Sequence, residues 1–136
     1  MTWKSKLNVM LFALYCTVLM LMSGFKSAEM YLQYINSLEM WLGGDKLMHL
    51  YLALVLAFLA LPVASVISVK GKISTVFTLF AMLMVCLLLD ELHQAGVSTR
   101  YFDWYDTLFG GLGLMVGLGA RLFFDRFIFL SSQHIK

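Results

Sequence analysis

The stretch DKLMHLYLALVLAFLALPVASVISV, residues 45–69, decides the fold. It opens with the polar side chains of Asp45, Lys46 and His49 and then continues for 20 residues without a charge. An α-helix needs about 20 predominantly apolar residues to cross the hydrocarbon core of a bilayer. We therefore predict a membrane-spanning helix over residues 47–69.

Three further apolar stretches predict the same kind of helix, at residues 7–25, 73–92 and 107–130. The chain has 136 residues, of which 61% are hydrophobic and 13% are charged, and this is too apolar for a soluble domain of its size. The expected fold class is an all-α membrane protein, a single domain (1–136) of four transmembrane helices. The first stretch also resembles a signal peptide, but Lys26 stands where cleavage needs a small residue, so we expect a retained helix.

The charged residues are sorted by the side of the membrane to which they would belong. One set of connecting segments holds almost only Lys and Arg, with Asp125 as its single acid, and the other set holds most of the acids. Cytoplasmic loops favour Lys and Arg. We therefore expect both termini in the cytoplasm, and we expect the acidic segments, with any chemistry, at the outer surface.

Two stripes of small residues predict how the helices pack. The stripe in residues 47–69 is Ala53, Ala57, Ala60 and Ala64, and the stripe in residues 107–130 is Gly110, Gly113 and Gly117. Small residues at this spacing let helix backbones approach closely within a bilayer. The two stripes could pack against each other, and either one could instead bind a partner membrane protein.

Extending both stripes outward leads to polar side chains. Asp45 and His49 lie on the face of Ala53, and Asp106 lies on the face of Gly110. The outer end of the third predicted helix adds Asp90, Glu91, His93 and Gln94. We expect these polar groups to converge near the outer membrane boundary, where a carboxylate is a functional candidate by default.

The same residues resemble the pattern of the VanZ-like family of small bacterial membrane proteins. In chain order the matching residues are Asp45, Lys46 and His49 (Asp-Lys-x-x-His), Glu91 and Gln94 (Glu-x-x-Gln), Arg100, and Asp106 above Gly113 and Gly117. The match covers residues 45–120, with departures at Ala53, residues 98–99 and Gly110, where the family often has an aromatic residue, Pro-Gly and Asn. The resemblance implies a multi-pass protein of the bacterial plasma membrane with a role in the cell envelope. The founding member is associated with resistance to glycopeptide antibiotics, notably teicoplanin.

The predicted ligand-binding residues are Asp45, Lys46, His49, Glu91, Gln94, Arg100 and Asp106. If the protein catalyses a reaction, the candidates for acid and base are His49, Glu91 and Asp106, although no nucleophile stands out. The ligand types would suit a metal ion, but no compact metal motif is present. We therefore predict no metal or other cofactor, with a divalent cation as the open alternative.

Simpler structural roles stay open for most of these residues. Asp45 could complement the dipole at a helix start, and Lys46 could be an interfacial anchor. Glu91 and Gln94 could form a solvated helix end, and Arg100 could make an ordinary salt bridge. Four other residues receive no functional assignment: Asp90 and His93 are predicted on the surface, and Cys16 and Cys86 within apolar helices.

The leading functional hypothesis is a protein that binds or screens an amphiphile at the outer leaflet. The ligand would be a lipid-linked wall precursor or a lipopeptide or glycopeptide antibiotic. Because acids outnumber bases on the predicted outer side, an anionic head group would be repelled unless a divalent cation bridged it. The alternatives are a structural subunit of a larger membrane assembly and a hydrolase or transferase acting on a lipid-linked substrate. Nucleic acid is not an expected partner.

Overall fold

The computed structural model describes residues 2–68, 71–96 and 102–133, which form α-helices without a strand. The helices are α1 (Trp3–Ser27), α2 (Leu32–Trp41), α3 (Asp45–Ile67), α4 (Lys72–Ala95) and α5 (Trp104–Gln133). Four of them, α1, α3, α4 and α5, are long and apolar enough to cross a membrane. The predicted all-helical architecture is confirmed, and each predicted span coincides with one of these helices to within a few residues at either end.

The helix α2 was not expected, because we treated the segment before Asp45 as a connection. Its ten residues are too few to span a bilayer, so the sequence has no long apolar run there that would predict a helix. The chain turns into α2 through Glu29 and Tyr31, both in the left-handed backbone region, and leaves it through Gly43 and Gly44 with φ of 93° and 111°. Glycine adopts such angles without a steric penalty. Thus α2 is bounded by a turn at each end.

The closest packing in the molecule is between α3 and α5. A Cβ atom added at Gly113 would lie 2.2 Å from the Leu50 carbonyl oxygen, and one added at Gly117 would lie 2.2 Å from that of Leu54. Ala53 and Ala57 of α3 face these glycines and are buried. The predicted mutual packing of the two small-residue stripes is therefore confirmed for these positions, and their faces are occupied within the chain.

Gly110 departs from this prediction, since it faces a different helix. A Cβ atom at Gly110 would meet the Leu87 side chain of α4 at 2.9 Å. The glycine face of α5 is thus shared: its middle contacts α3, and the turn nearest Asp106 contacts α4. This sharing brings the first turn of α5 between the two neighbouring helices.

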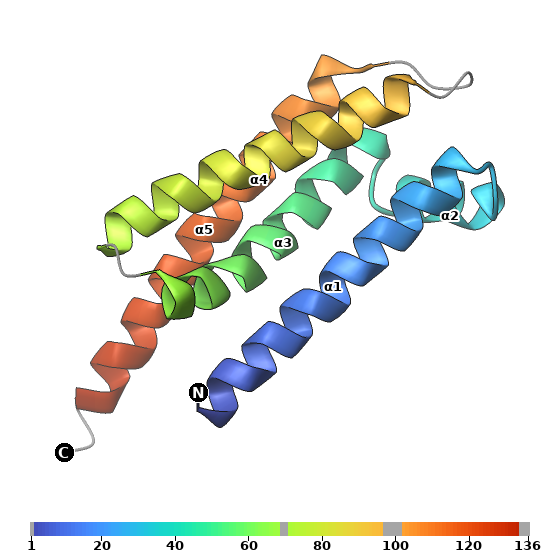
Figure 1. The fold of residues 1–136 in the computed structure, drawn as a ribbon. Helices are drawn as coiled ribbons and strands as arrows, with labels where there is room; N and C mark the ends of the chain where they lie inside the picture. The colour runs from blue at the N-terminus through green and yellow to red at the C-terminus, as the bar shows by residue number, and fades with distance from the viewer. Residues whose placement is uncertain (1, 69–70, 97–101, 134–136) are drawn as a thin grey trace.

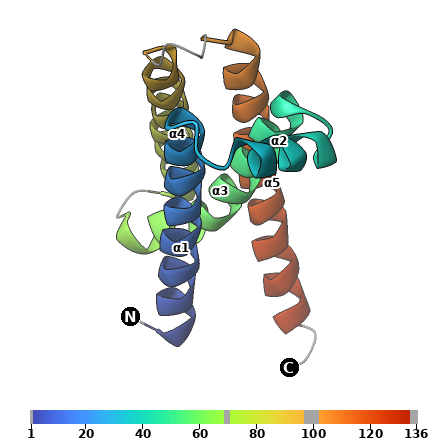
Figure 2. The same cartoon turned by 90° about the vertical axis from the view of Figure 1, so that its right-hand side faces the viewer.

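The remaining helix, α1, packs more loosely. It has no buried residue, and it contacts α3, where the Tyr15 hydroxyl donates to the Leu52 carbonyl at 2.8 Å. In both ribbon views the start of α1 and the end of α5 lie at the same end of the bundle (Figures 1 and 2). The opposite end carries α2, the start of α3 and the start of α5, and we call it the polar end. The predicted polar residues that the structure describes lie there.

Candidate ligand site at the polar end of the bundle

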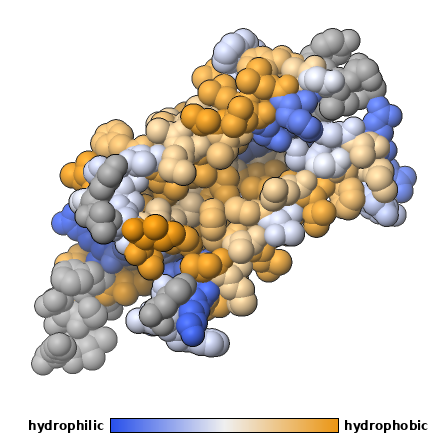
Figure 3. Space-filling view, viewed as in Figure 1, coloured by the Kyte–Doolittle hydropathy of each residue, from blue (hydrophilic) through white to orange (hydrophobic). Residues whose placement is uncertain are grey.

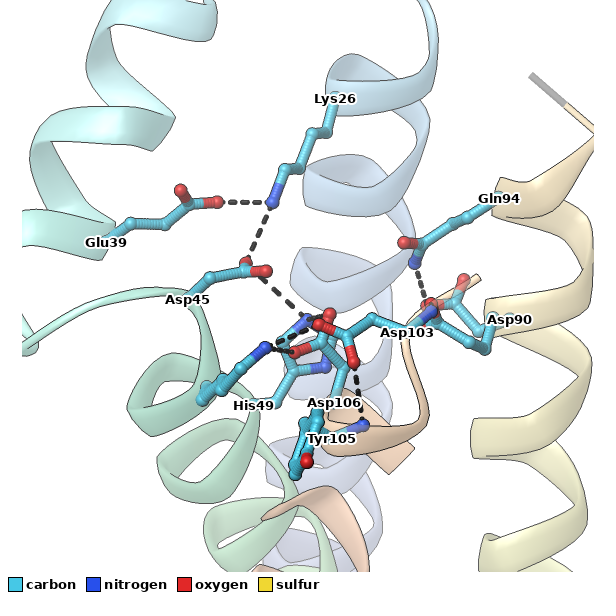
Figure 4. Close-up of polar contacts among 11 residues, drawn as sticks. Lys26, Glu39, Asp45, His49, Asp90, Gln94, Asp103, Tyr105 and Asp106 are labelled. Carbon is cyan, nitrogen blue, oxygen red and sulfur yellow. Dashed lines mark hydrogen bonds and ion pairs between the residues drawn. The ribbon is translucent and has the colours of Figure 1, made fainter. Parts of the chain in front are cut away.

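At the centre of the polar end, α3 and α5 bring an imidazole between two carboxylates. His49 lies one turn after Asp45 on α3, and Asp106 lies in the first turn of α5. His49 Nε2 is 3.7 Å from Asp45 Oδ1 and 4.0 Å from Asp106 Oδ2. Figure 4 shows the three side chains turned toward one another. The side chain of Asp106 is only 6% exposed, so this carboxylate depends on its neighbours for compensation.

Two lysines neutralise part of this charge, and each one bridges two carboxylates. Lys26, at the end of α1, pairs with Glu39 of α2 and donates to Asp45 Oδ1 at 3.0 Å. Lys46 of α3 donates to Asp103 Oδ2 at 2.5 Å and to Asp106 Oδ1 at 3.2 Å. Four carboxylates thus meet two ammonium groups, and carboxylates outnumber ammonium groups around His49 among the described residues.

Asp103 and Glu91 position the start of α5. Asp103 Oδ1 accepts the backbone N–H of Tyr105 at 2.8 Å, and the Asp103 N–H donates to Glu91 Oε1 at 2.9 Å. The hydrogen bond from Lys46, and then that from the Tyr105 N–H, lowers the pKa of Asp103, because both stabilise the ionised carboxylate. Glu91 is buried, with 3% of its surface exposed. Its contact with the segment before α5 is structural, and a solvated helix end is the wrong interpretation for this residue.

A second polar group lies where α1 and α4 face each other. Asp90 of α4 accepts from the Ser23 hydroxyl at 2.8 Å and from Gln94 Nε2 at 2.6 Å. The prediction of Asp90 as a surface residue is therefore wrong, because the side chain is half-buried and links two helices. Gln94 is buried, and its Oε1 atom has no hydrogen-bond partner among the described residues. His93, by contrast, is exposed as predicted.

Between α1, α3 and α4 the structure has a pocket of about 490 Å³. Its long wall is apolar and includes Phe12, Leu19, Leu52, Leu56, Leu83 and Leu87. Its polar end is lined by Ser23, Lys26, His49, Asp90 and Gln94, and Ile35 of α2 lies beside them. The surface between α1 and α4 is hollowed and mostly apolar, with hydrophilic residues toward the end where α2 lies (Figure 3). The size matches pockets that hold small molecules.

The structure thus brings most of the predicted site residues close to one another. Asp45, Lys46, His49 and Asp106 form one cluster, Glu91 joins it through Asp103, and Gln94 lines the neighbouring pocket. Arg100 lies outside the described residues. Asp45 lies in the first turn of α3, where a carboxylate complements the helix dipole as the structural alternative has it, and its side chain also accepts from Lys26. Lys46 is an ion-pair partner of two acids.

Sequence reasoning gave no site role to Asp90 and Asp103, and it missed three further members of the site: Ser23, Lys26 and Glu39. Of these three, only Lys26 could have been found from the sequence, because it is a cation in a predicted outer segment whose other charged residues are mostly acids. Ser23 and Glu39 carry no such signal. Their positions depend on how α1 and α2 lie against α3 and α4, and no spacing along the chain predicts that arrangement.

The site offers two kinds of chemistry. The pocket can hold an apolar chain with a polar group at the end that Gln94 and Asp90 line, and Asp45, His49 and Asp106 present possible metal-ligand atoms within 4.8 Å of one another. Comparison of the chain with protein-family models, with curated proteins and with solved structures finds no significant match. The function of this protein is therefore inferred from the pocket and from the acidic cluster beside it.

Proposed function

We propose that this protein is a VanZ-like membrane protein of the bacterial cell envelope that binds an amphiphile taken from the outer leaflet. The observation that carries the proposal is the pocket between α1, α3 and α4, because it is apolar along its wall and polar at one end. An acyl or prenyl chain would lie along the apolar wall. The polar part of the molecule would reach Asp90, Gln94 and His49.

The charge sorting of the loops supports an orientation for this site. The end opposite the polar end carries the basic connecting residues, including Lys4, Lys6 and Lys72. Because cytoplasmic segments favour Lys and Arg, we propose that both termini are cytoplasmic and that the polar end faces the periplasm or the cell exterior in the plasma membrane. A ligand would then enter laterally from the outer leaflet through the opening between α1 and α4.

The polar end also restricts the head group. Acids outnumber lysines there, and Gln94 Oε1 is a buried acceptor that lacks a donor among the described residues. A buried acceptor without a partner costs free energy, so a ligand that donates a hydrogen bond gains affinity. These features favour an amine-bearing or zwitterionic head group. Lipopeptide and lipoglycopeptide antibiotics fit this chemistry, which supports a role in screening such compounds, whereas a lipid-linked wall precursor needs a cation to bridge its phosphates.

The test is to fill the pocket and to measure what the protein carries. Cys86 lines the pocket, while its neighbour Val85 does not and is exposed on the same helix. Wild type, Cys86→Phe and Val85→Phe would be purified in gentle detergent and analysed by native mass spectrometry and lipid extraction. We expect wild type and Val85→Phe to retain a stoichiometric amount of amphiphile, and Cys86→Phe to retain about one tenth of that amount or less. The reason is that a phenyl ring in the pocket competes with the amphiphile's chain for the same volume.

Two other outcomes with the same samples would contradict the proposal. Equal amounts of the same amphiphile in all three proteins would mean that the pocket does not hold it. A stoichiometric partner protein in all three, without any lipid, would favour the alternative of a structural subunit. Monodisperse gel filtration of Cys86→Phe controls for misfolding.

A further inference from the structure

His49 lies between two carboxylates at the polar end of the bundle. The side chain is 17% exposed, and it makes no hydrogen bond within the part of the chain that the structure describes. Its Nε2 atom faces Asp45 Oδ1 at 3.7 Å and Asp106 Oδ2 at 4.0 Å, and both distances exceed the usual limit of about 3.2 Å for an N–H···O hydrogen bond. His49 therefore lies within ion-pair distance of both carboxylates without a hydrogen bond to either one.

These separations are slightly longer than those of atoms that share a metal ion. Ligands about 2.0–2.2 Å from a tetrahedral Zn²⁺ are about 3.3–3.6 Å from one another. One ligand atom each from Asp45, His49 and Asp106 can be chosen so that all lie within 4.8 Å of one another. Small side-chain rotations would close the remaining difference. The three residues come from two helices that pack tightly, so the ligand backbones are held in place.

The surrounding charges also allow a divalent cation. Each lysine that touches Asp45 or Asp106 has a second carboxylate to hold it, Glu39 for Lys26 and Asp103 for Lys46. Lys46 Nζ is nearer to Asp103 than to Asp106, at 2.5 against 3.2 Å. Both lysines can therefore stay paired while the two aspartates turn toward an ion. Within the described residues, four carboxylates and two ammonium groups leave two more negative than positive charges, which is the charge that a divalent ion neutralises.

We propose that Asp45, His49 and Asp106 form a binding site for a divalent transition-metal ion, of which Zn²⁺ is the best fit. One imidazole and two carboxylates suit Zn²⁺, whereas Ca²⁺ and Mg²⁺ prefer ligand sets made of oxygen. Three protein ligands leave one position open for water or for an oxygen atom of another molecule. Because His49 also lines the pocket, that position lies at its polar end. The metal site does not depend on the amphiphile proposed above.

The experiment uses tag-free, full-length protein in detergent, freed of metal with a chelator and of bound lipid by washing. Zn²⁺ alone is titrated by calorimetry, and the metal content is measured after desalting. We expect one Zn²⁺ per chain in wild type and no stoichiometric binding of Ca²⁺. His49→Gln should weaken Zn²⁺ binding by more than about 100-fold, because loss of a direct ligand exceeds the 10–100-fold effect of a group that only orients a ligand. The matched control His93→Gln removes an exposed histidine one helix away and should leave the affinity unchanged.

A second pair of variants keeps the test decisive if His49→Gln does not fold. Asp45 is half-buried, with 37% of its side chain exposed, so Asp45→Asn should fold and lose Zn²⁺ affinity. Asp125→Asn is its control, since Asp125 pairs with Arg121 toward the other end of α5. Substoichiometric Zn²⁺ in wild type, equal loss in His49→Gln and His93→Gln, or preferential binding of Ca²⁺ would overturn the proposal. Because lipid content is measured separately, failure of the metal site leaves the amphiphile result standing, and the reverse also holds.

Discussion

Gly117 and Gly119 stand two residues apart in α5, and only one of them is required by the packing. A Cβ atom at Gly117 would lie 2.2 Å from the Leu54 carbonyl oxygen of α3, whereas one at Gly119 has no atom within 4 Å. Because the obstacle at Gly117 is backbone, a side-chain rotation cannot relieve it. The whole helix pair would have to separate.

We predict that Gly117→Ala destabilises the protein by about 1–3 kcal/mol, the usual cost of adding a methyl group to a well-packed core. The control Gly119→Ala adds the same methyl group to the same helix and should be neutral or slightly stabilising, since alanine favours the helix over glycine. Thermal unfolding in detergent, followed by circular dichroism, measures both. Equal stability of the two variants would show that α3 and α5 do not approach as closely as described.

At the scale of elements, α2 is held by few contacts. Ile35 is its only buried residue, with 7% of its surface exposed, and Glu39 pairs with Lys26 of α1. Ile35 also lines the pocket, so the position of α2 helps to shape the polar end. The ion pair contributes less, because Lys26 and Glu39, with side chains 17% and 16% exposed, lose hydration that offsets much of their attraction. We conclude that Ile35 supplies most of the attachment of α2.

Ile35→Ala should therefore loosen α2 while leaving the four long helices intact. Removing a buried isoleucine side chain costs about 2 kcal/mol at the low end of measured values, which corresponds to an approximately 30-fold faster exchange of the α2 amide hydrogens. Hydrogen–deuterium exchange followed by mass spectrometry reports this directly. Leu38→Ala, which truncates a more exposed residue of the same helix, is the control and should change the exchange little. If both variants exchanged alike, Ile35 would not be the anchor.

At the scale of the whole molecule, the open question is which end of the bundle faces outward. The polar end and the end with the termini are opposite one another in the ribbon (Figure 1). Ser37 on α2 marks the polar end, and Gly71, at the start of α4, marks the other. Both positions are exposed, so a cysteine placed at either one can be labelled without disturbing a buried contact.

We predict that, with Cys16 and Cys86 replaced by alanine, an impermeant maleimide labels Ser37→Cys in intact bacterial cells and labels Gly71→Cys only after permeabilisation. The physical reason is the retention of Lys and Arg on the cytoplasmic side during insertion. Labelling of Gly71→Cys alone in intact cells would reverse the proposed orientation. It would also move the pocket opening to the cytoplasmic leaflet.

Much of this protein could be predicted from the sequence because membrane insertion imposes simple requirements on a chain. Apolar runs of about 20 residues are needed to cross a bilayer, and they located α1, α3, α4 and α5 to within a few residues. Close approach of helices in lipid needs small residues, and the spacing of Ala53 and Ala57 with Gly113 and Gly117 indicated which helices meet. The faces of α3 and α5 in turn placed His49 and Asp106 together.

Only the tertiary structure decided the rest, because these features depend on contacts between segments that no local pattern encodes. The helix α2 is too short for a hydropathy signal, and its placement brings Glu39 to Lys26. Gly110 belongs to the α4 contact because α5 crosses between two helices. Asp90 of α4 bonds to Ser23 of α1, and the pocket exists because α1 packs on α3 and, away from that bond, has few contacts with α4. Composition determined that the chain forms helices long and apolar enough to cross a membrane, and the way those helices pack determined where the pocket lies.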